Sequence, residues 1–532
     1  MPQIQLYDTT LRDGAGREGI SFTVEDKLRI VRKLDELGVH FIEGGWPGSN
    51  PKDDEFFALA QGLSLSNAQL VAFASTRRSN TKAEKDPNLL ALLQAGTKVV
   101  TIVGKSWDHH VTQVLETSLE ENLGMIADSI GHLKSQGRTV FFDAEHFFDG
   151  YKANPEYALK TIKMAADAGA SCVILCDTNG GALPQEVSTA IAVAKRETSV
   201  PLGIHAHNDA ELAVANTLAA VEAGATQVQG TINGYGERCG NANLCSVIPT
   251  LKLKMGIDCI TEEQLAMLTE VAHYVAEIAN LTIDSHLPYV GSSAFAHKAG
   301  LHIDAMIKWE ESYHHVDPEL VGNRWRTLVS ELSGRGGIVY KAKERGLELD
   351  AKDERTLAIL SQIKAMESRG FQYDGAEASF ELIIRRSQPD YRPLFELVDF
   401  MVMVEKRRRP PTIEEEELLS EATVKVKVGG EVIHTAAEGN GPVNALDAAL
   451  RKALLVFYPS LAAVRLVDYK VRAIDETEGT ASRVCVFIES SDGKHEWRTV
   501  GSSSNIIEAS WLALADSLEY WLLRQAAEGG VL

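Results

Sequence analysis

The stretch Val24-Glu-Asp-Lys-Leu-Arg-Ile-Val-Arg-Lys-Leu-Asp-Glu-Leu37 is followed by Gly38 and by His40-Phe-Ile-Glu-Gly44, and this succession decides the fold. Apolar residues three and four positions apart predict a helix over residues 24–37. Gly38 is typical of a residue directly after a helix C-terminus. The short apolar run that follows predicts a strand. The stretch therefore predicts one helix followed by one strand.

The same alternation of strand and helix patterns continues through the first 260 residues. Eight strands in about 260 residues match an α/β fold of the (β/α)8 TIM-barrel type in number and length. A doubly wound open sheet is the alternative, and it would more usually carry a glycine-rich phosphate turn after its first strand. Residues 14–19 fit the bare G-x-G-x-x-G string, but no helix pattern begins inside them. The predicted strands are 4–8, 40–44, 70–74, 98–103, 138–142, 171–177, 201–205 and 226–232.

The rest of the chain predicts two further regions. We expect a catalytic barrel over residues 1–265, a linker region with helices over 266–410, and an α+β domain over 415–532. The run Lys406–Arg409, the pair Pro410-Pro411 and the acidic run Glu414–Glu417 predict a solvated linker. In the last domain we expect strands at 422–428, 467–473 and 483–489, and helices at 443–455 and 505–524.

Composition excludes several classes of protein. The 532 residues include 53 Lys and Arg against 74 Asp and Glu, a formal net charge of −21, which argues against nucleic acid or an anionic membrane as the main partner. No apolar stretch approaches the roughly 20 residues of a membrane-spanning helix, and the N-terminus lacks the pattern of a secretory signal. Six cysteines are few for this length and fit a reducing cytoplasm, and Cys172 and Cys176 lie in an apolar run that predicts burial.

Polar side chains follow most of the predicted barrel strands. The active sites of TIM barrels lie at the C-terminal ends of the strands, so these residues are expected to meet in one site. Packing alone does not explain such a concentration of polar groups. In strand order they are Asp8, Arg12 and Asp13; Glu43; Asp143, Glu145 and His146; Asp177, Thr178 and Asn179; His205, His207, Asn208 and Asp209; and the segment 233–241.

The His205-Ala-His207 sequence predicts a metal site. Residues two apart on a strand face the same side, so both imidazoles can ligate one ion. Asp13, from the strand that lies beside them in a closed barrel, would complete a set of two histidines and one carboxylate. The alternative is a pair of solvated loop histidines. Arg12 is expected to bind a substrate carboxylate or a developing oxyanion, with a loop salt bridge as its alternative.

Three motifs together resemble a known family: Asp8-Thr-Thr-Leu-Arg-Asp-Gly14, His205-Ala-His-Asn-Asp209 and Asn233-Gly-Tyr-Gly-Glu-Arg-Cys-Gly-Asn-Ala-Asn243. They are similar to the metal-dependent acyltransferase branch of the DRE-TIM metallolyase superfamily, which contains 2-isopropylmalate, homocitrate and citramalate synthases. The region from about residue 415 resembles the LeuA-type dimerisation and regulatory domain of that branch. Residues 42–51 and 295–302 are most similar to citramalate synthases of the longer bacterial form.

The resemblance implies roles for individual residues. The implied ligands of a divalent metal are Asp13, His205 and His207, with Asn241 in a weaker fourth position. The remaining implied roles are Arg12 for polarising the keto acid, Thr178 for its carboxylate, Glu145 as a catalytic acidic residue, and His302 with Tyr313 as a catalytic pair supplied by the partner subunit of a homodimer. One departure is Gly16, followed by Arg17, where many members carry Gln.

The implied reaction is a metal- and acetyl-CoA-dependent condensation with pyruvate that gives (R)-citramalate and CoA and serves isoleucine biosynthesis. The enzyme would be an acyltransferase that converts the acyl group to an alkyl group on transfer, with Mn²⁺, Mg²⁺ or Zn²⁺ as the ion. The alternatives are a 2-isopropylmalate synthase, another 2-keto acid acyltransferase, a superfamily aldolase or lyase, and a non-enzymatic amino-acid sensor. A related carboxyltransferase would need a modified lysine, and Lys98 and Lys105 lack a supporting motif.

The C-terminal domain contains two similar turn-and-helix segments. Glu438-Gly-Asn-Gly-Pro442 precedes the helix predicted from Val443, and Val500-Gly-Ser-Ser-Ser-Asn505 precedes the last helix. Glycines and a first-turn proline at a helix N-terminus leave backbone N–H groups available to a carboxylate. We therefore expect two quasi-equivalent units that bind an amino-acid effector, isoleucine being the expected one. The alternative is a pair of capped helices that only dimerise.

Overall fold

The computed structural model describes residues 4–328, 335–344, 346–350, 352–405, 419–474 and 482–527. It contains two compact units, Met1–Phe295 with His314–Trp325, and Ala296–Tyr313 with Arg326–Leu532. None of the described helices has the length and apolar character needed to cross a lipid bilayer. The predicted linker at residues 406–417 and the boundary at 410–415 lie outside the described residues. The predicted limits of the three regions stay predictions.

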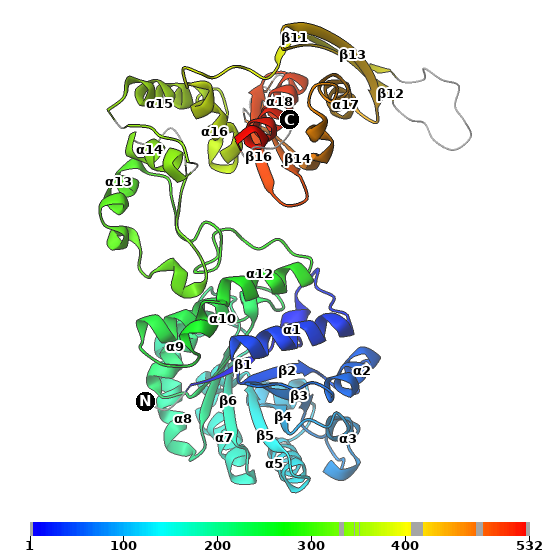
Figure 1. Ribbon diagram of the computed structural model, residues 1–532. Coiled ribbons are helices and arrows are strands. Elements are labelled where there is room, and N and C mark those ends of the chain that lie inside the picture. Colours follow the sequence, from blue (N-terminus) through cyan, green and yellow to red (C-terminus); the bar gives the residue numbers. More distant parts are fainter. Residues whose placement is uncertain are drawn as a thin grey trace, which may run out of the picture. The chain divides into compact units, whose positions relative to one another are not determined.

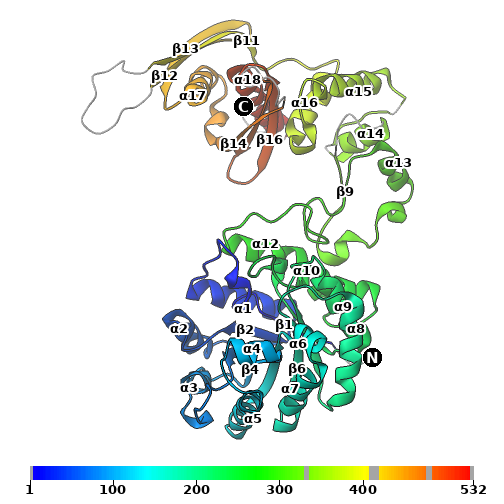
Figure 2. The same ribbon diagram turned by 180° about the vertical axis from the view of Figure 1, so that it is seen from behind.

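The first unit is a closed parallel barrel of eight strands in sequence order (Figures 1 and 2). The strand β1 pairs with β8 as well as with β2, with Tyr7 opposite Gln229, so the TIM barrel is confirmed and the open sheet is wrong. The strands are β1 Gln5–Asp8, β2 Phe41–Gly45, β3 Gln69–Ser75, β4 Val99–Lys105, β5 Thr139–Glu145, β6 Cys172–Asp177, β7 Leu202–Ala206 and β8 Gln227–Gly230.

Helices surround the barrel and carry the predicted end signals. The helix α1 begins with a capping box between Thr23 and Asp26 and ends at Gly38, whose φ of 88° is left-handed. The helices of this unit are α1 Val24–Leu37, α2 Pro51–Ala60, α3 Pro87–Gln94, α4 Asp108–Gln113, α5 Leu119–Ser135, α6 Phe147–Ala153, α7 Pro155–Ala168, α8 Pro184–Glu197, α9 Ala213–Ala223, α10 Leu244–Pro249, α11 Glu262–Leu265 and α12 Leu268–Ile278.

Three predicted strand ends differ from the structure by two residues or more. The strands β4 and β5 extend to Lys105 and Glu145, because their ladder continues in register beyond the last apolar residue of each run. The strand β8 ends at Gly230 instead of residue 232, because the chain turns into a 3-10 segment, Ile232–Gly234. The barrel interior contains Cys172 and Cys176, which are 2% and 5% exposed, so their predicted burial is confirmed.

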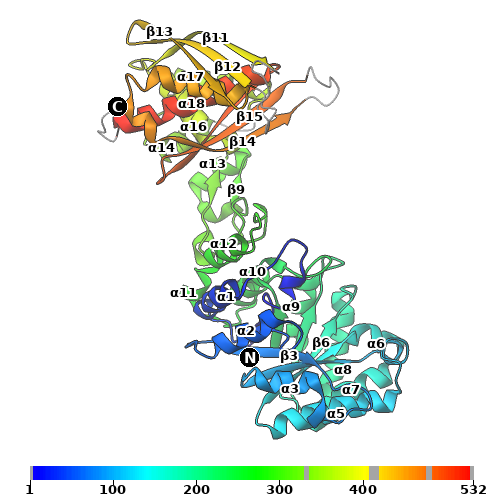
Figure 3. The same ribbon diagram turned by 90° about the vertical axis from the view of Figure 1, so that its right-hand side faces the viewer.

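The second unit contains helices followed by two antiparallel sheets, which confirms the predicted α+β class (Figure 3). Each three-stranded sheet precedes a helix, so two similar units are present, while their predicted binding of an effector stays a prediction. The elements are β9 Ala296–His297, α13 Gly300–Lys308, β10 Arg326–Thr327, α14 Arg335–Glu344, α15 Glu354–Glu367, α16 Glu377–Arg386, β11 Glu396–Glu405, β12 Leu419–Val428, β13 Glu431–Gly439, α17 Pro442–Leu454, β14 Arg465–Ala473, β15 Val484–Ser491, β16 Glu496–Ser503 and α18 Ile506–Ala527.

Five strands of this unit were not predicted: the two-residue strands β9 and β10, and the longer strands β11, β13 and β16. The segment Val500–Ser503 was expected to be part of a turn and instead belongs to β16. Its small residues serve close packing, since a methyl group on Gly501 would lie 2.0 Å from the backbone oxygen of Ala509 in α18. The strand β11 pairs with β12, and Phe400 and Val402 pack against the same apolar core as α17.

Candidate active site

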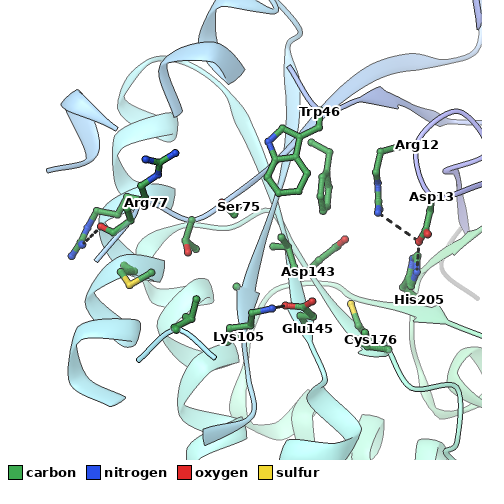
Figure 4. A pocket seen from close by; sticks show the side chains of 18 of the residues that line it. Arg12, Asp13, Trp46, Ser75, Arg77, Lys105, Asp143, Glu145, Cys176 and His205 are labelled. Atoms are coloured by element: carbon green, nitrogen blue, oxygen red, sulfur yellow. Dashed lines mark hydrogen bonds and ion pairs between the residues drawn. The ribbon is translucent and has the colours of Figure 1, made fainter. Parts of the chain in front are cut away.

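A cavity of about 640 Å³ opens at the C-terminal ends of the barrel strands, where the sequence predicted a site (Figure 4). Six of the predicted site residues line it together: Arg12, Asp13, Glu145, Thr178, His205 and His207. Trp46, Phe73 and Val103 add apolar walls. The barrel thus brings together residues that are up to 195 positions apart in the chain.

Asp13, His205 and His207 form the one group of three possible metal ligands among the described residues. One ligand atom from each lies within 4.8 Å of the other two. Oδ2 of Asp13 is 3.1 Å from Nε2 of His205 and 3.8 Å from Nε2 of His207. Figure 4 shows the side chain of Asp13 pointing at that of His205, with their ion pair drawn as a dashed line. The predicted ligand set therefore has the geometry to converge on one ion.

A hydrogen-bond relay orients His205. Gln229 donates from Nε2 to Oδ1 of Asp143 at 3.2 Å, so its Oε1 accepts from Nδ1 of His205 at 2.9 Å. This bond places the ring proton on Nδ1 and leaves the lone pair of Nε2 directed toward Asp13. Gln229 was not among the predicted site residues, whereas Asp143, predicted at a strand end without a role of its own, also lines the cavity. One signal in the sequence could have identified Gln229: it is a polar residue inside a short strand, β8, that pairs with a neighbouring strand on each side.

The pKa shifts of Asp13 and His207 suit metal binding. Burial lowers the pKa of His207 to about 4, so its ring is neutral near pH 7. Burial by itself would raise the pKa of Asp13, but Arg12 and His205 outweigh it and hold that pKa well below its usual range. Burial would lower the pKa of His205, yet its bond to Asp13 raises it. A carboxylate next to two imidazoles fits a divalent cation that accepts oxygen and nitrogen ligands.

Asn241 is placed beside this group by a backbone bridge to His207. Its Nδ2 donates to the backbone oxygen of Tyr235 at 3.1 Å, and within the described residues its buried Oδ1 has no hydrogen-bond partner. A buried carbonyl oxygen without a partner is unfavourable unless something else satisfies it. An amide oxygen held in this way fits the predicted role of a fourth, weaker ligand.

Arg12 is held by three neighbours. Its Nε donates to Oε1 of Glu43 at 2.5 Å, its guanidinium lies 3.9 Å from the centre of the Phe73 ring, and Nη1 is 3.6 Å from Oδ2 of Asp13. Glu43 is fully buried. Arg12 therefore forms the salt bridges of the alternative interpretation and also lines the cavity, and its binding of a substrate stays a prediction. Glu43 fixes its orientation, a role that the sequence did not predict.

Thr178 and Glu145 lie at the ends of neighbouring strands. The hydroxyl oxygen of Thr178 accepts a hydrogen bond from the backbone N–H of His146 at 2.9 Å, so its own O–H proton is free to be donated. His146 adopts the left-handed φ of 55° that aims this N–H. Glu145 forms an ion pair with Lys105 inside the cavity.

The loops that follow β6, β7 and β8 are joined by Arg238, which belongs to the predicted segment 233–241 but had no predicted role of its own. Its Nε and Nη2 donate to both carboxylate oxygens of Asp209 at 2.8 Å. The same Nη2 donates to the backbone oxygen of Thr178 at 2.7 Å. This bidentate bridge connects the Thr178 loop to the loop that begins at His207.

Gly16 and Arg17, the departure from the resembled family, both face the loop after β8. A methyl group on Gly16 would lie 2.8 Å from Cγ of Glu237, so a larger side chain requires Glu237 to move. The guanidinium of Arg17 lies 5.3 Å from the centre of the Tyr235 ring. The departure alters packing against this loop and leaves the ligand set intact.

His302 and Tyr313 belong to the second compact unit. His302 lies on α13, and Tyr313 ends a 3-10 turn, Glu310–Tyr313. Their rings stack with centroids 4.1 Å apart. The structure thus brings the predicted pair together. Its action on the barrel site of a partner subunit stays a prediction.

Comparison with protein families accounts for most of the chain. Residues 3–275 match the HMGL-like family, residues 289–370 match the homocitrate synthase post-HMGL domain-like family, and residues 374–522 match the LeuA allosteric (dimerisation) domain. The first match contains the barrel strands and the predicted metal ligands.

Individual relatives match over nearly the full length. The chain is 57% identical to the (R)-citramalate synthase of Geobacter sulfurreducens, covering 98% of each protein. It is 53% identical to the (R)-citramalate synthase of Aquifex aeolicus, covering 99% of each. The 2-isopropylmalate synthase of Methanocaldococcus jannaschii is more distant, at 32% identity over 98% of this chain and 95% of that protein.

Proposed function

This chain belongs to the (R)-citramalate synthase family, and we propose that its barrel cavity condenses acetyl-CoA with pyruvate to give (R)-citramalate and CoA. The enzyme is an acyltransferase-type synthase. The observation that carries the site assignment is the convergence of Asp13, His205 and His207 with Arg12 in one cavity.

The reaction balances with water as the third reactant. The methyl group of acetyl-CoA loses a proton, and the resulting carbanion forms a carbon–carbon bond to C2 of pyruvate. The former keto oxygen takes up a proton and becomes the tertiary hydroxyl of the product. Water then adds to the thioester carbonyl, and CoA leaves as a thiol. A base, a carbonyl-polarising group and a proton donor are therefore needed.

Asp13, His205 and His207, with Asn241, would hold a divalent cation such as Mn²⁺, Mg²⁺ or Zn²⁺. When bound, such an ion polarises a 2-keto acid through its keto and carboxylate oxygens. The unpartnered Oδ1 of Asn241 and the Nε2 of His205, freed by Gln229, are the features that support this assignment.

The anionic substrate would meet two groups of this chain. Arg12, oriented by Glu43, presents its guanidinium to the cavity and would stabilise the keto oxygen as charge develops on it. Thr178 would donate its free hydroxyl proton to the substrate carboxylate. Trp46 and Phe73, whose rings meet edge to face at 5.4 Å, form an apolar wall of the same cavity.

Proton transfer is assigned to three side chains. Glu145 lies in the cavity as the base. His302 and Tyr313 would act from the partner subunit of a homodimer, consistent with the match of residues 374–522 to a dimerisation domain. Their rings are stacked, so both would reach the same site together.

The amino-acid effector is part of the same proposal. We assign isoleucine, the end product of the pathway that would consume citramalate, to the C-terminal domain matched by an allosteric domain model. The segment directly before α17 is Gly439-Asn440-Gly441, and Pro442 is the first residue of the helix. A cytoplasmic location completes the proposal.

The deciding experiment is a panel of 2-keto acids with acetyl-CoA and metal-reconstituted enzyme, followed by CoA release and product identification. We expect the highest kcat/KM for pyruvate, because a pocket shaped for a methyl group excludes an isopropyl group by contact. That discrimination can exceed the ~1–3 kcal/mol of one missing methylene. A higher kcat/KM for 2-ketoisovalerate would show instead a 2-isopropylmalate synthase.

A further inference from the structure

Lys105 and Glu145 end two neighbouring barrel strands in direct register. The strands β4 and β5 pair from Val99 opposite Thr139 to Lys105 opposite Glu145. The side chains of Lys105 and Glu145 form an ion pair inside the cavity, as Figure 4 shows. They are 21% and 24% exposed, so solvent screens the pair only in part.

The backbone on both sides of this pair is fixed. Nδ2 of Asn122, on α5, donates to the backbone oxygen of Lys105 at 2.9 Å. The N–H of Ser106 donates to the backbone oxygen of Glu145 at 3.0 Å. Two strand ends that are tied in this way hold the ammonium and the carboxylate in one relative position.

The ion pair involves only one of the two carboxylate oxygens of Glu145. Nζ of Lys105 donates to Oε2 of Glu145, and Oε1 has no hydrogen bond to any part of the chain that the structure describes. An ionised carboxylate accepts hydrogen bonds through both oxygens. Oε1 is therefore the atom that remains available to a proton from a bound substrate.

Other charged groups surround the pair. Asp143 precedes Glu145 by two residues on β5 and therefore faces the same side of the strand. His110 on α4 and His146 after β5 have ring centroids 4.1 Å apart, and Asp149 on α6 lies 3.1 Å from Nδ1 of His146. Asp143 and Asp149 are thus the acidic groups near Glu145, and Lys105 is the cation paired with it.

We propose that Lys105 is a positioning residue for the condensation: its ion pair with Oε2 fixes the carboxylate of Glu145 and holds Oε1 free in the cavity as the base. The proposal rests on the function proposed above. It assigns no substrate contact to Lys105, which acts only through Glu145.

The test compares kcat in four variants of the full-length, metal-reconstituted enzyme: Lys105→Met, Lys105→Arg, Glu145→Gln and the double variant Lys105→Met/Glu145→Gln. Lys98→Met is the matched control, because Lys98 is an exposed lysine directly before the same strand. A positioned base contributes typically ~10²–10⁴-fold to a rate. We expect Lys105→Met to lower kcat by ~10–100-fold, a part of that factor.

The double variant separates a positioning role from an independent one. If Lys105 acts through Glu145, the double variant is no slower than Glu145→Gln alone, because the two losses share one cause. Lys105→Arg restores a cation and should recover most of the rate. In Lys105→Met the acidic limb of the kcat profile should move to higher pH, while KM for pyruvate and the bound metal stay unchanged. A structural defect alone would not move that limb.

Several results would overturn the proposal. They are a kcat for Lys105→Met equal to that of Lys98→Met, losses that multiply in the double variant, or a loss of bound metal in Lys105→Met. If thermal unfolding shows that Lys105→Met is not folded, Lys105→Gln replaces it in the same comparisons. A wild-type enzyme that prefers 2-ketoisovalerate contradicts the proposed acceptor and leaves the Lys105 comparison intact with that substrate.

Discussion

Replacing Glu43 by Gln should remove the ion pair that holds the Arg12 side chain in its orientation. The buried carboxylate of Glu43 accepts from Tyr7 Oη at 2.5 Å, from Thr9 Oγ1 at 2.7 Å and from Arg12 Nε at 2.5 Å. Burial and the nearby carboxylate of Glu43 raise the pKa of Tyr7 far above its usual value, so Tyr7 remains a donor. An amide in place of the carboxylate would turn one acceptor into a donor that faces another donor.

The size of the effect follows from this burial. Breaking a buried ion pair by removing one charge typically costs about 3–5 kcal/mol in the free energy of unfolding. A charge-assisted hydrogen bond contributes about 1.5–3 kcal/mol, so the loss of Arg12 orientation should lower kcat/KM for pyruvate by ~10–100-fold. Arg12 keeps its contacts with Asp13 and Phe73, which favours the lower end of that range.

The assay measures urea unfolding, bound metal and kcat/KM by CoA thiol release, well below the unfolding temperature. Glu25→Gln is the matched control, because Glu25 pairs with Arg29 at 3.2 Å on the solvent side of α1, with side chains 59% and 54% exposed. Exposed pairs contribute about 0–1 kcal/mol. If Glu43→Gln matched this control in both stability and kcat/KM, Glu43 would not orient Arg12.

Four further outcomes are expected. His207→Ala should remove bound metal and activity together, whereas His302→Ala should keep the metal and lower kcat by ~10²–10⁴-fold, as metal analysis and kinetics will show. Mixing inactive His302→Ala and Asp13→Ala subunits should restore part of the activity if His302 acts across the dimer, and no recovery after verified subunit exchange would count against that arrangement. Burial raises the pKa of Asp8 from 3.8 to about 7, so the free energy of unfolding should fall as pH rises from about 4 to 7; Asp8→Asn should reduce this slope in urea titrations of metal-free enzyme. Isoleucine should inhibit the intact enzyme at subsaturating acetyl-CoA with a coupling of ~1–3 kcal/mol, and an equal lack of response to isoleucine, leucine and valine would leave the C-terminal domain with a structural role only.

The barrel could be predicted from the sequence because its signals are local. Helix periodicity, terminal glycines and short apolar runs depend on neighbouring residues, and their alternation specified the order of the strands. The group of possible metal ligands was also predictable, since His205 and His207 lie two apart at the end of one strand and strand order places Asp13 beside them. The resemblance of three motifs to a family supplied the reaction.

Pairing between distant segments determined the rest. The strands β11, β13 and β16 lack a strong local pattern, and their ladders with β12 and β15 stabilise them. The relay from Gln229 to His205, the carboxylate of Glu43 behind Arg12 and the pair of Lys105 with Glu145 each join different strands. A sequence shows which polar residues exist, but burial and register decide which of them meet. The catalytic residue types were therefore predicted from the sequence, and their orientation was determined by the closed barrel.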